Sequence, residues 1–154
     1  MKKINWKRLI ISILIPLAVG IISGLISMPF MDFSEVIQPP LAPPGWLFPI
    51  VWTILYTLMG VSFYLILETY NYDKDTSYIV YFTQLFVNGL WSIFFFVFKW
   101  RLFSSIWLIL LIILIIVMII KFYKINKVAG LLQIPYLLWC LFALYLNVGI
   151  YLLN

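Results

Sequence analysis

The side chains that could do chemistry in this 154-residue chain are aromatic rings and amides placed at helical intervals. Trp52 and Tyr56 are four residues apart, so they share one face of a helix. Gln84 and Asn88 have the same spacing. Amides are costly in an apolar medium unless they are paired, so this second face must point into the protein. Aromatic rings with a few amides suit a large, flat, mostly apolar ligand that is held by stacking.

Two further groups extend these faces. Trp91 and Ser92 lie one turn further along the amide face. Trp139, Ala143 and Asn147 are spaced four residues apart, and the small Ala143 leaves a notch between two larger side chains. The residues alone leave two interpretations open for all these faces. They pack and hydrogen-bond neighbouring helices together, or they form the walls of a ligand cavity.

Several kinds of chemistry are excluded by what the chain lacks. It has no histidine and a single cysteine, Cys140, which removes His-based catalytic triads, His-ligated zinc, a proximal-His haem and an internal disulfide. Asp32 and Glu35 lie between two apolar runs of the sequence, and no Asp or Glu lies inside an apolar run. Proton-driven transport, ion conduction and hydrolysis are therefore disfavoured, and neither a metal site nor a required cofactor is predicted.

The composition identifies the surroundings of these side chains. Hydrophobic residues make up 66% of the chain, against roughly 45–50% in a soluble domain, and charged residues make up 10%, against roughly 25%. A soluble fold of this length cannot bury so much apolar surface, so a lipid bilayer must cover most of it. This excludes a soluble enzyme, a disordered chain and a secreted disulfide module.

Charge-free runs predict an all-α integral membrane protein built as a bundle of five transmembrane helices. Each run can supply the ~20 residues that a helix needs to cross ~30 Å of hydrocarbon. A β-barrel is excluded because residues 108–120 are apolar throughout instead of alternating. We predict one domain, 1–154, with helices at about 7–29, 46–68, 77–98, 103–122 and 129–152.

The loop before the second predicted helix, about residues 30–45, is rich in proline. Proline fixes φ, lacks an N–H group and restricts the residue before it, so this loop is predicted to be stiff and extended. Two interpretations remain open: the loop only stops a helix, or it forms a lid over a cavity. Pro135 is expected to kink the last helix or to free a carbonyl near Gln133.

The positive charges predict the orientation of a multi-pass protein in the cell membrane. With a cytoplasmic N-terminus and an external C-terminus, every Lys and Arg except Lys99 and Arg101 falls on the cytoplasmic side. The net charge of +5 is therefore an orientation signal and an anchor for anionic headgroups. No nucleic-acid partner is predicted.

Three blocks of residues, in order along the chain, resemble a known membrane-protein family. They run from Pro43 to Tyr56 (PPGWLFPIVWTILY), from Gln84 to Phe96 (QLxxNxxWSxxFF) and from Pro135 to Asn147 (PYxxWxxFAxxxN). On these motifs the chain resembles the TspO/MBR family of tryptophan-rich sensory and translocator proteins. The resemblance extends from about residue 15 to the C-terminus.

The resemblance implies a fold, a ligand and a set of site residues. It implies a five-helix bundle, usually a homodimer, with a pocket that opens toward the first loop and binds porphyrins such as protoporphyrin IX. Some bacterial members degrade protoporphyrin in light and oxygen, and the two tryptophans implicated there match Trp52 and Trp139. The positions that match other pocket residues of the family are Pro43, Pro44, Tyr56, Asn88, Trp91, Ser92 and Ala143.

Three functions are compatible with the resemblance: a tetrapyrrole receptor without turnover, a light-dependent porphyrin-degrading enzyme, and a transporter of porphyrins or other apolar metabolites such as sterols.

The chain departs from the family at two places. Leu41 stands where many members have a tryptophan before the lid prolines, and no basic residue follows Tyr145, so the C-terminal sterol motif is absent. With no histidine to ligate iron, we expect a preference for metal-free porphyrin over haem.

Overall fold

The computed structural model describes residues 2–71 and 73–154, and all regular elements in that part of the chain are helices. Two short helical segments, η1 (Met28–Phe30) and η2 (Ile93–Val97), extend two of the long helices. The α-helices are α1 (Trp6–Ser27), α2 (Leu47–Glu68), α3 (Asp75–Ser92), α4 (Arg101–Ile125), α5 (Lys127–Leu131) and α6 (Ile134–Leu153).

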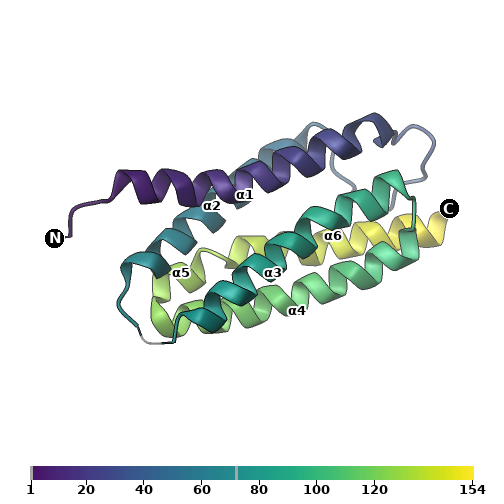
Figure 1. Cartoon of the computed structure of the whole chain (residues 1–154). Coiled ribbons are helices and arrows are strands. Elements are labelled where there is room, and N and C mark those ends of the chain that lie inside the picture. The colour runs from purple at the N-terminus through teal and green to yellow at the C-terminus, as the bar shows by residue number, and fades with distance from the viewer. Residues whose placement is uncertain (1, 72) are drawn as a thin grey trace.

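Within the described residues, five helical segments are long and apolar enough to cross a membrane. They run side by side along one axis, and the two chain termini lie at opposite ends of the bundle (Figure 1). This confirms the prediction of an all-α membrane protein with five spans. We call the end that carries the C-terminus, residues 31–46 and the α3–α4 turn the loop end (Figure 1).

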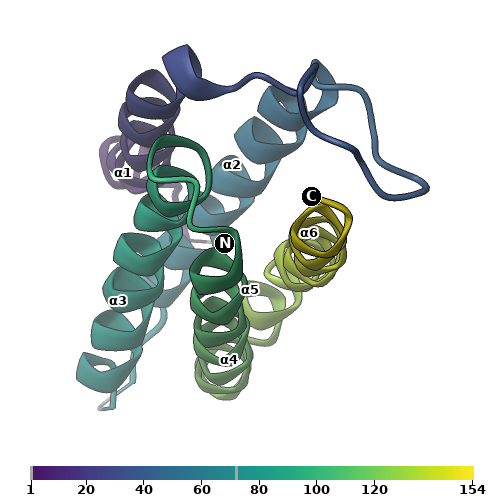
Figure 2. The same cartoon turned by 90° about the vertical axis from the view of Figure 1, so that its right-hand side faces the viewer.

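The five spans form a ring when the bundle is viewed along its axis, in the order α1, α2, α6, α4 and α3 (Figure 2). Helix α4 is apolar on every face because one side packs in the core, as Ile115 does, and the other faces lipid, as Ile113 does. Large side chains that are fully buried in the core include Met59, Tyr81, Ile115, Met118 and Tyr136.

The fifth span runs over Lys127–Leu153, close to the predicted 129–152. It is interrupted near Gln133, where Pro135 was expected to disturb the helix: α5 ends at Leu131 and α6 begins at Ile134. Pro135 lies in the first turn of α6, where its missing N–H group costs no hydrogen bond. The span breaks there because proline starts a helix more readily than it continues one.

The proline-rich segment, residues 31–46, crosses from the end of α1 over α2 toward α6 (Figure 2). Two contacts tie it to α6. The Tyr145 hydroxyl donates to the Pro40 carbonyl at 2.7 Å, and Asn154 Nδ2 donates to the Ile37 carbonyl at 2.9 Å. These bonds satisfy loop carbonyls that a chain without regular structure leaves unpaired. The segment is therefore held across the loop end of the bundle.

Candidate functional site

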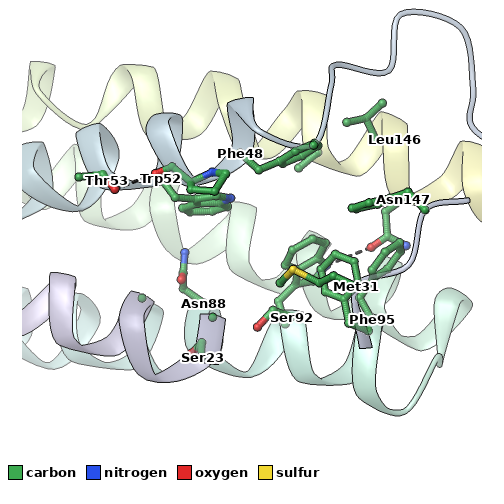
Figure 3. A pocket seen from close by; sticks show the side chains of 18 of the residues that line it. Ser23, Met31, Phe48, Trp52, Thr53, Asn88, Ser92, Phe95, Leu146 and Asn147 are labelled. Atoms are coloured by element: carbon green, nitrogen blue, oxygen red, sulfur yellow. Dashed lines mark hydrogen bonds between the residues drawn. The ribbon is translucent and has the colours of Figure 1, made fainter. Parts of the chain in front are cut away.

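A cavity of about 360 Å³ lies at the loop end, within the range of about 300–1,000 Å³ that is typical of small-molecule sites. Helices α1, α2, α3 and α6 supply its walls, which are mainly apolar, and residues of the proline-rich segment line it as a lid. Trp52 and Phe48 project from α2 on one side of the cavity, and Asn88 and Ser92 lie on the other side (Figure 3).

The structure brings most of the predicted site residues to this cavity. Pro43 and Pro44 are not on its wall, although Ala42 and Gly45 on either side of them are. Trp139 is one ring removed from the cavity. It contacts the wall residue Phe48, with ring centroids 5.8 Å apart at an interplanar angle of 69°. The predicted residues on the wall are Trp52, Tyr56, Asn88, Trp91, Ser92 and Ala143.

Stacking holds the tryptophans of the wall in place. Trp52 stacks on Tyr56, with ring centroids 5.4 Å apart and an interplanar angle of 29°. Trp91 stacks on Phe95 at 5.3 Å and 19°. Tyr56 packs closely over Gly20 of α1, where an added Cβ would lie 2.7 Å from the Tyr56 Cδ2 atom. The rings are therefore fixed before any ligand arrives, which lowers the entropic cost of stacking on a flat ligand.

The predicted amides are paired with phenols on other helices. The Tyr56 hydroxyl donates to Asn88 Oδ1 at 2.6 Å, and Asn88 Nδ2 donates to the Tyr136 oxygen at 2.8 Å. The Tyr136 hydroxyl in turn donates to Gln84 Oε1 at 2.8 Å. This chain of hydrogen bonds runs from the cavity wall into the core and joins α2, α3 and α6. It explains how the membrane bundle tolerates two buried amides.

Replacing Asn88 by leucine is expected to lower the free energy of unfolding by about 1–3 kcal/mol, because the buried Tyr56 hydroxyl loses its acceptor. The cost should shrink in the double variant Asn88→Leu, Tyr56→Phe, which removes both partners. Unfolding in a mild detergent, measured for both single variants and the double variant, gives the coupling energy. Strictly additive effects would contradict the pairing.

A second hydrogen-bonded cluster fixes the wall nearest the loop end. Asn147 Oδ1 accepts a hydrogen bond from Trp91 Nε1 at 3.0 Å. Asn147 Nδ2 donates to the Arg101 carbonyl at 3.0 Å and to Ser105 Oγ at 2.7 Å. One amide on α6 therefore positions both an indole of the cavity wall and the first turn of α4.

In the described chain, charged side chains lie close to the cavity only at the loop end. Asp32, Glu35, Lys99 and Arg101 surround a small neighbouring pocket there. Hydrogen bonds from Ser34, with a smaller contribution from Lys99, hold the pKa of Asp32 below its ordinary value. Asp32 is therefore negative at neutral pH. Among the described residues, no three or more His, Cys, Asp or Glu side chains are grouped so that they could hold a metal ion.

Sequence reasoning missed two parts of the site. Leu17, Gly20, Ser23 and Gly24 line the cavity from α1. Gly20 and Gly24 form a G-x-x-x-G pattern that indicates a close-packing face, but the pattern does not show that this face borders a cavity. Tyr136 links the two amides, and its hydroxyl was a usable signal because most buried phenols have a hydrogen-bond partner.

Comparison with known proteins identifies the family. The family model described as TspO/MBR matches residues 12–153. The chain belongs to the TspO/MBR family. All the residues that line the cavity fall inside the matched range, so the cavity is part of the TspO/MBR domain.

Individual TspO/MBR proteins align with most of the chain. It is 39% identical over 152 residues to the tryptophan-rich protein TspO of Archaeoglobus fulgidus, covering 97% of this chain and 99% of the relative. The tryptophan-rich protein TspO of Chlorobaculum tepidum is 36% identical over 124 residues, 79% of this chain and 78% of the relative. The translocator protein of Ovis aries is 28% identical over 121 residues, 77% of this chain and 72% of the relative. These similarities confirm the resemblance inferred from the three motif blocks.

Proposed function

We propose that this TspO/MBR protein binds a tetrapyrrole of the protoporphyrin IX type in the cavity at the loop end of its membrane bundle. The observation that carries the proposal is the wall of the cavity. Tryptophans held by stacking on neighbouring rings enclose a mainly apolar space of about 360 Å³. A flat conjugated ring can stack on such surfaces and bury its apolar area there.

The polar groups of the wall support the same class of ligand. The Tyr56 hydroxyl and the Asn88 amide are hydrogen-bonded to each other, and Asn147 accepts a hydrogen bond from Trp91. A ligand with few hydrogen-bonding groups therefore leaves the Asn88 and Asn147 amides paired when it excludes water. A sugar or a peptide would bury many polar groups of its own against apolar side chains, which costs free energy.

A dark titration of the purified protein with protoporphyrin IX tests this proposal. The Soret absorbance is followed in nonionic detergent, and we expect a shift that saturates at one ligand per chain. Protein-free detergent at the same concentration is the control, because porphyrins partition into micelles. A titration that never saturates, or that follows the protein-free curve, would contradict the proposal.

A second candidate, light- and oxygen-dependent porphyrin degradation, is favoured by the place of Trp52 on the wall and its stacking on Tyr56. Indole is the most easily oxidised neutral side chain of the site, so a photoexcited porphyrin beside Trp52 would have an electron donor in contact. Trp139 is not on the wall and contacts the wall residue Phe48.

Trp52→Phe is therefore expected to abolish a light-driven, protein-held porphyrin product, while Trp139→Phe slows its formation by a smaller factor. Both variants should retain dark binding, because phenylalanine keeps an aromatic surface. Loss of the porphyrin band under illumination in air is followed for wild type and both variants, with Trp6→Phe, an exposed tryptophan at the other end of the bundle, as the control. Equal amounts of product from wild type and Trp52→Phe would contradict the role of Trp52, whereas dark binding by wild type with no protein-held product in the light would leave a receptor without turnover.

A further inference from the structure

A small polar pocket adjoins the cavity at the loop end. It has a volume of about 40 Å³ and is formed by residues 30–36 together with the α3–α4 turn. Phe33 and Phe96 line both this pocket and the cavity, and their ring centroids are 5.7 Å apart at an interplanar angle of 89°. We call this small polar pocket the rim pocket. The two spaces meet along these rings.

The rim pocket combines exposed acids with a half-buried cation. Asp32, Glu35 and Lys99 are all exposed, so water screens their charges. The Arg101 guanidinium is partly buried and lies over the Phe95 ring, with Cζ 4.2 Å from the ring centroid. Phe95 itself lines the cavity. Arg101 therefore places a positive charge at the boundary between the apolar cavity and the rim pocket.

Arg101 is held in place through its backbone but has no acidic partner in the described chain. Its carbonyl accepts hydrogen bonds from Asn147 Nδ2 at 3.0 Å and from Ser104 Oγ at 2.9 Å. Among the described residues, the one ion pair within 4.0 Å joins Arg8 to Glu68, near the other end of the bundle. A guanidinium that is partly removed from water without a carboxylate partner favours an anion supplied by a ligand.

We propose that the rim pocket binds a carboxylate of the ligand whose flat ring occupies the cavity, with Arg101 as its main partner and Lys99 as the second. This inference rests on the proposed porphyrin-binding function and narrows the ligand to flat amphipathic acids. The volume of about 40 Å³, against about 360 Å³ for the cavity, suits a carboxylate group better than the macrocycle. A neutral sterol would leave Arg101 unpaired.

Two ligands that differ in charge test the proposal: protoporphyrin IX, with its propionates free, and its dimethyl ester, with both propionates neutral. Each is titrated in the dark, in nonionic detergent, against wild type, Arg101→Gln and Lys99→Gln. Lys7→Gln, near the opposite end of the bundle, is the matched control. The readout is the ratio of the ester Kd to the diacid Kd for each protein. Comparing this ratio between proteins cancels the different partition of the two ligands into detergent.

Arg101→Gln should lower the ratio about tenfold, the effect of losing one charge-assisted contact, and Lys99→Gln should lower it about threefold. Lys7→Gln should leave it unchanged, and the ester should bind all four proteins equally well. An unchanged ratio in both loop-end variants overturns the carboxylate site and leaves porphyrin binding standing. Failure of both ligands to bind wild type saturably overturns the proposed function itself. If Arg101→Gln does not bind the ester, the substitution has damaged the cavity. The Kd ratio measured for Lys99→Gln then tests the carboxylate site alone.

Discussion

Replacing Ala143 by phenylalanine is expected to weaken the binding of protoporphyrin IX by about 10- to 100-fold. Ala143 is buried and lines the cavity from α6, so a phenyl group there occupies space that the ligand needs. Forcing extra volume into a filled site costs about 1–3 kcal/mol, and about 1.4 kcal/mol corresponds to a tenfold change in affinity. The dark titration measures the change directly.

The matched control for this prediction is Leu141→Phe. Leu141 lies on the same helix but is exposed on the outside of the bundle, so a larger ring there should leave the affinity unchanged. The unfolding midpoints of both variants show whether either substitution has damaged the fold. An intact Ala143→Phe variant that binds as tightly as wild type would mean that the ligand binds elsewhere.

Replacing Gly60 by valine is expected to lower the free energy of unfolding by about 3 kcal/mol or more. Helices α1 and α2 touch at this glycine. A Cβ atom at Gly60 would lie 2.6 Å from the Ser12 carbonyl oxygen and closer still to the Cα atom of Ile13. Both are backbone atoms and cannot rotate away, so the two helices would have to separate. Small residues permit such close helix contacts in membranes.

Gly24→Ala is the matched control for Gly60→Val. Gly24 lies in α1, and a Cβ atom there meets nothing within 4 Å. This substitution should stabilise the protein by about 0.5–1 kcal/mol, because alanine loses less backbone entropy than glycine in a helix. Unfolding of both variants is followed by circular dichroism in the same detergent. Equal stabilities of wild type and Gly60→Val would contradict the tight α1–α2 contact.

The spans could be predicted from the charged residues because a charge inside hydrocarbon is costly. The predicted 46–68 is α2, Leu47–Glu68, almost residue for residue. The predicted 103–122 falls short of α4, Arg101–Ile125, because a charge ends an apolar run but does not end a helix. A disturbance of the last span at Pro135 was predicted, but the sequence alone does not decide whether Pro135 bends a helix or starts one.

The cavity could be predicted only where polar groups mark its wall. Asn88 indicated an inward face because an unpaired amide is costly in lipid, and the structure places it on the cavity wall. Apolar wall residues such as Leu17 carry no such signal, since lipid and a cavity wall select the same side chains. Trp139 is not on the cavity wall and contacts the wall residue Phe48, and the spacing of residues along one helix does not give that arrangement.

We propose above all that the cavity at the loop end binds a tetrapyrrole. The most direct measurement is a structure of the protein determined in the dark with protoporphyrin IX. We expect the macrocycle inside the cavity, against Trp52 and Trp91, with a carboxylate beside Arg101. A macrocycle bound on the lipid-facing surface of the helices, or between two copies of the chain, would contradict it.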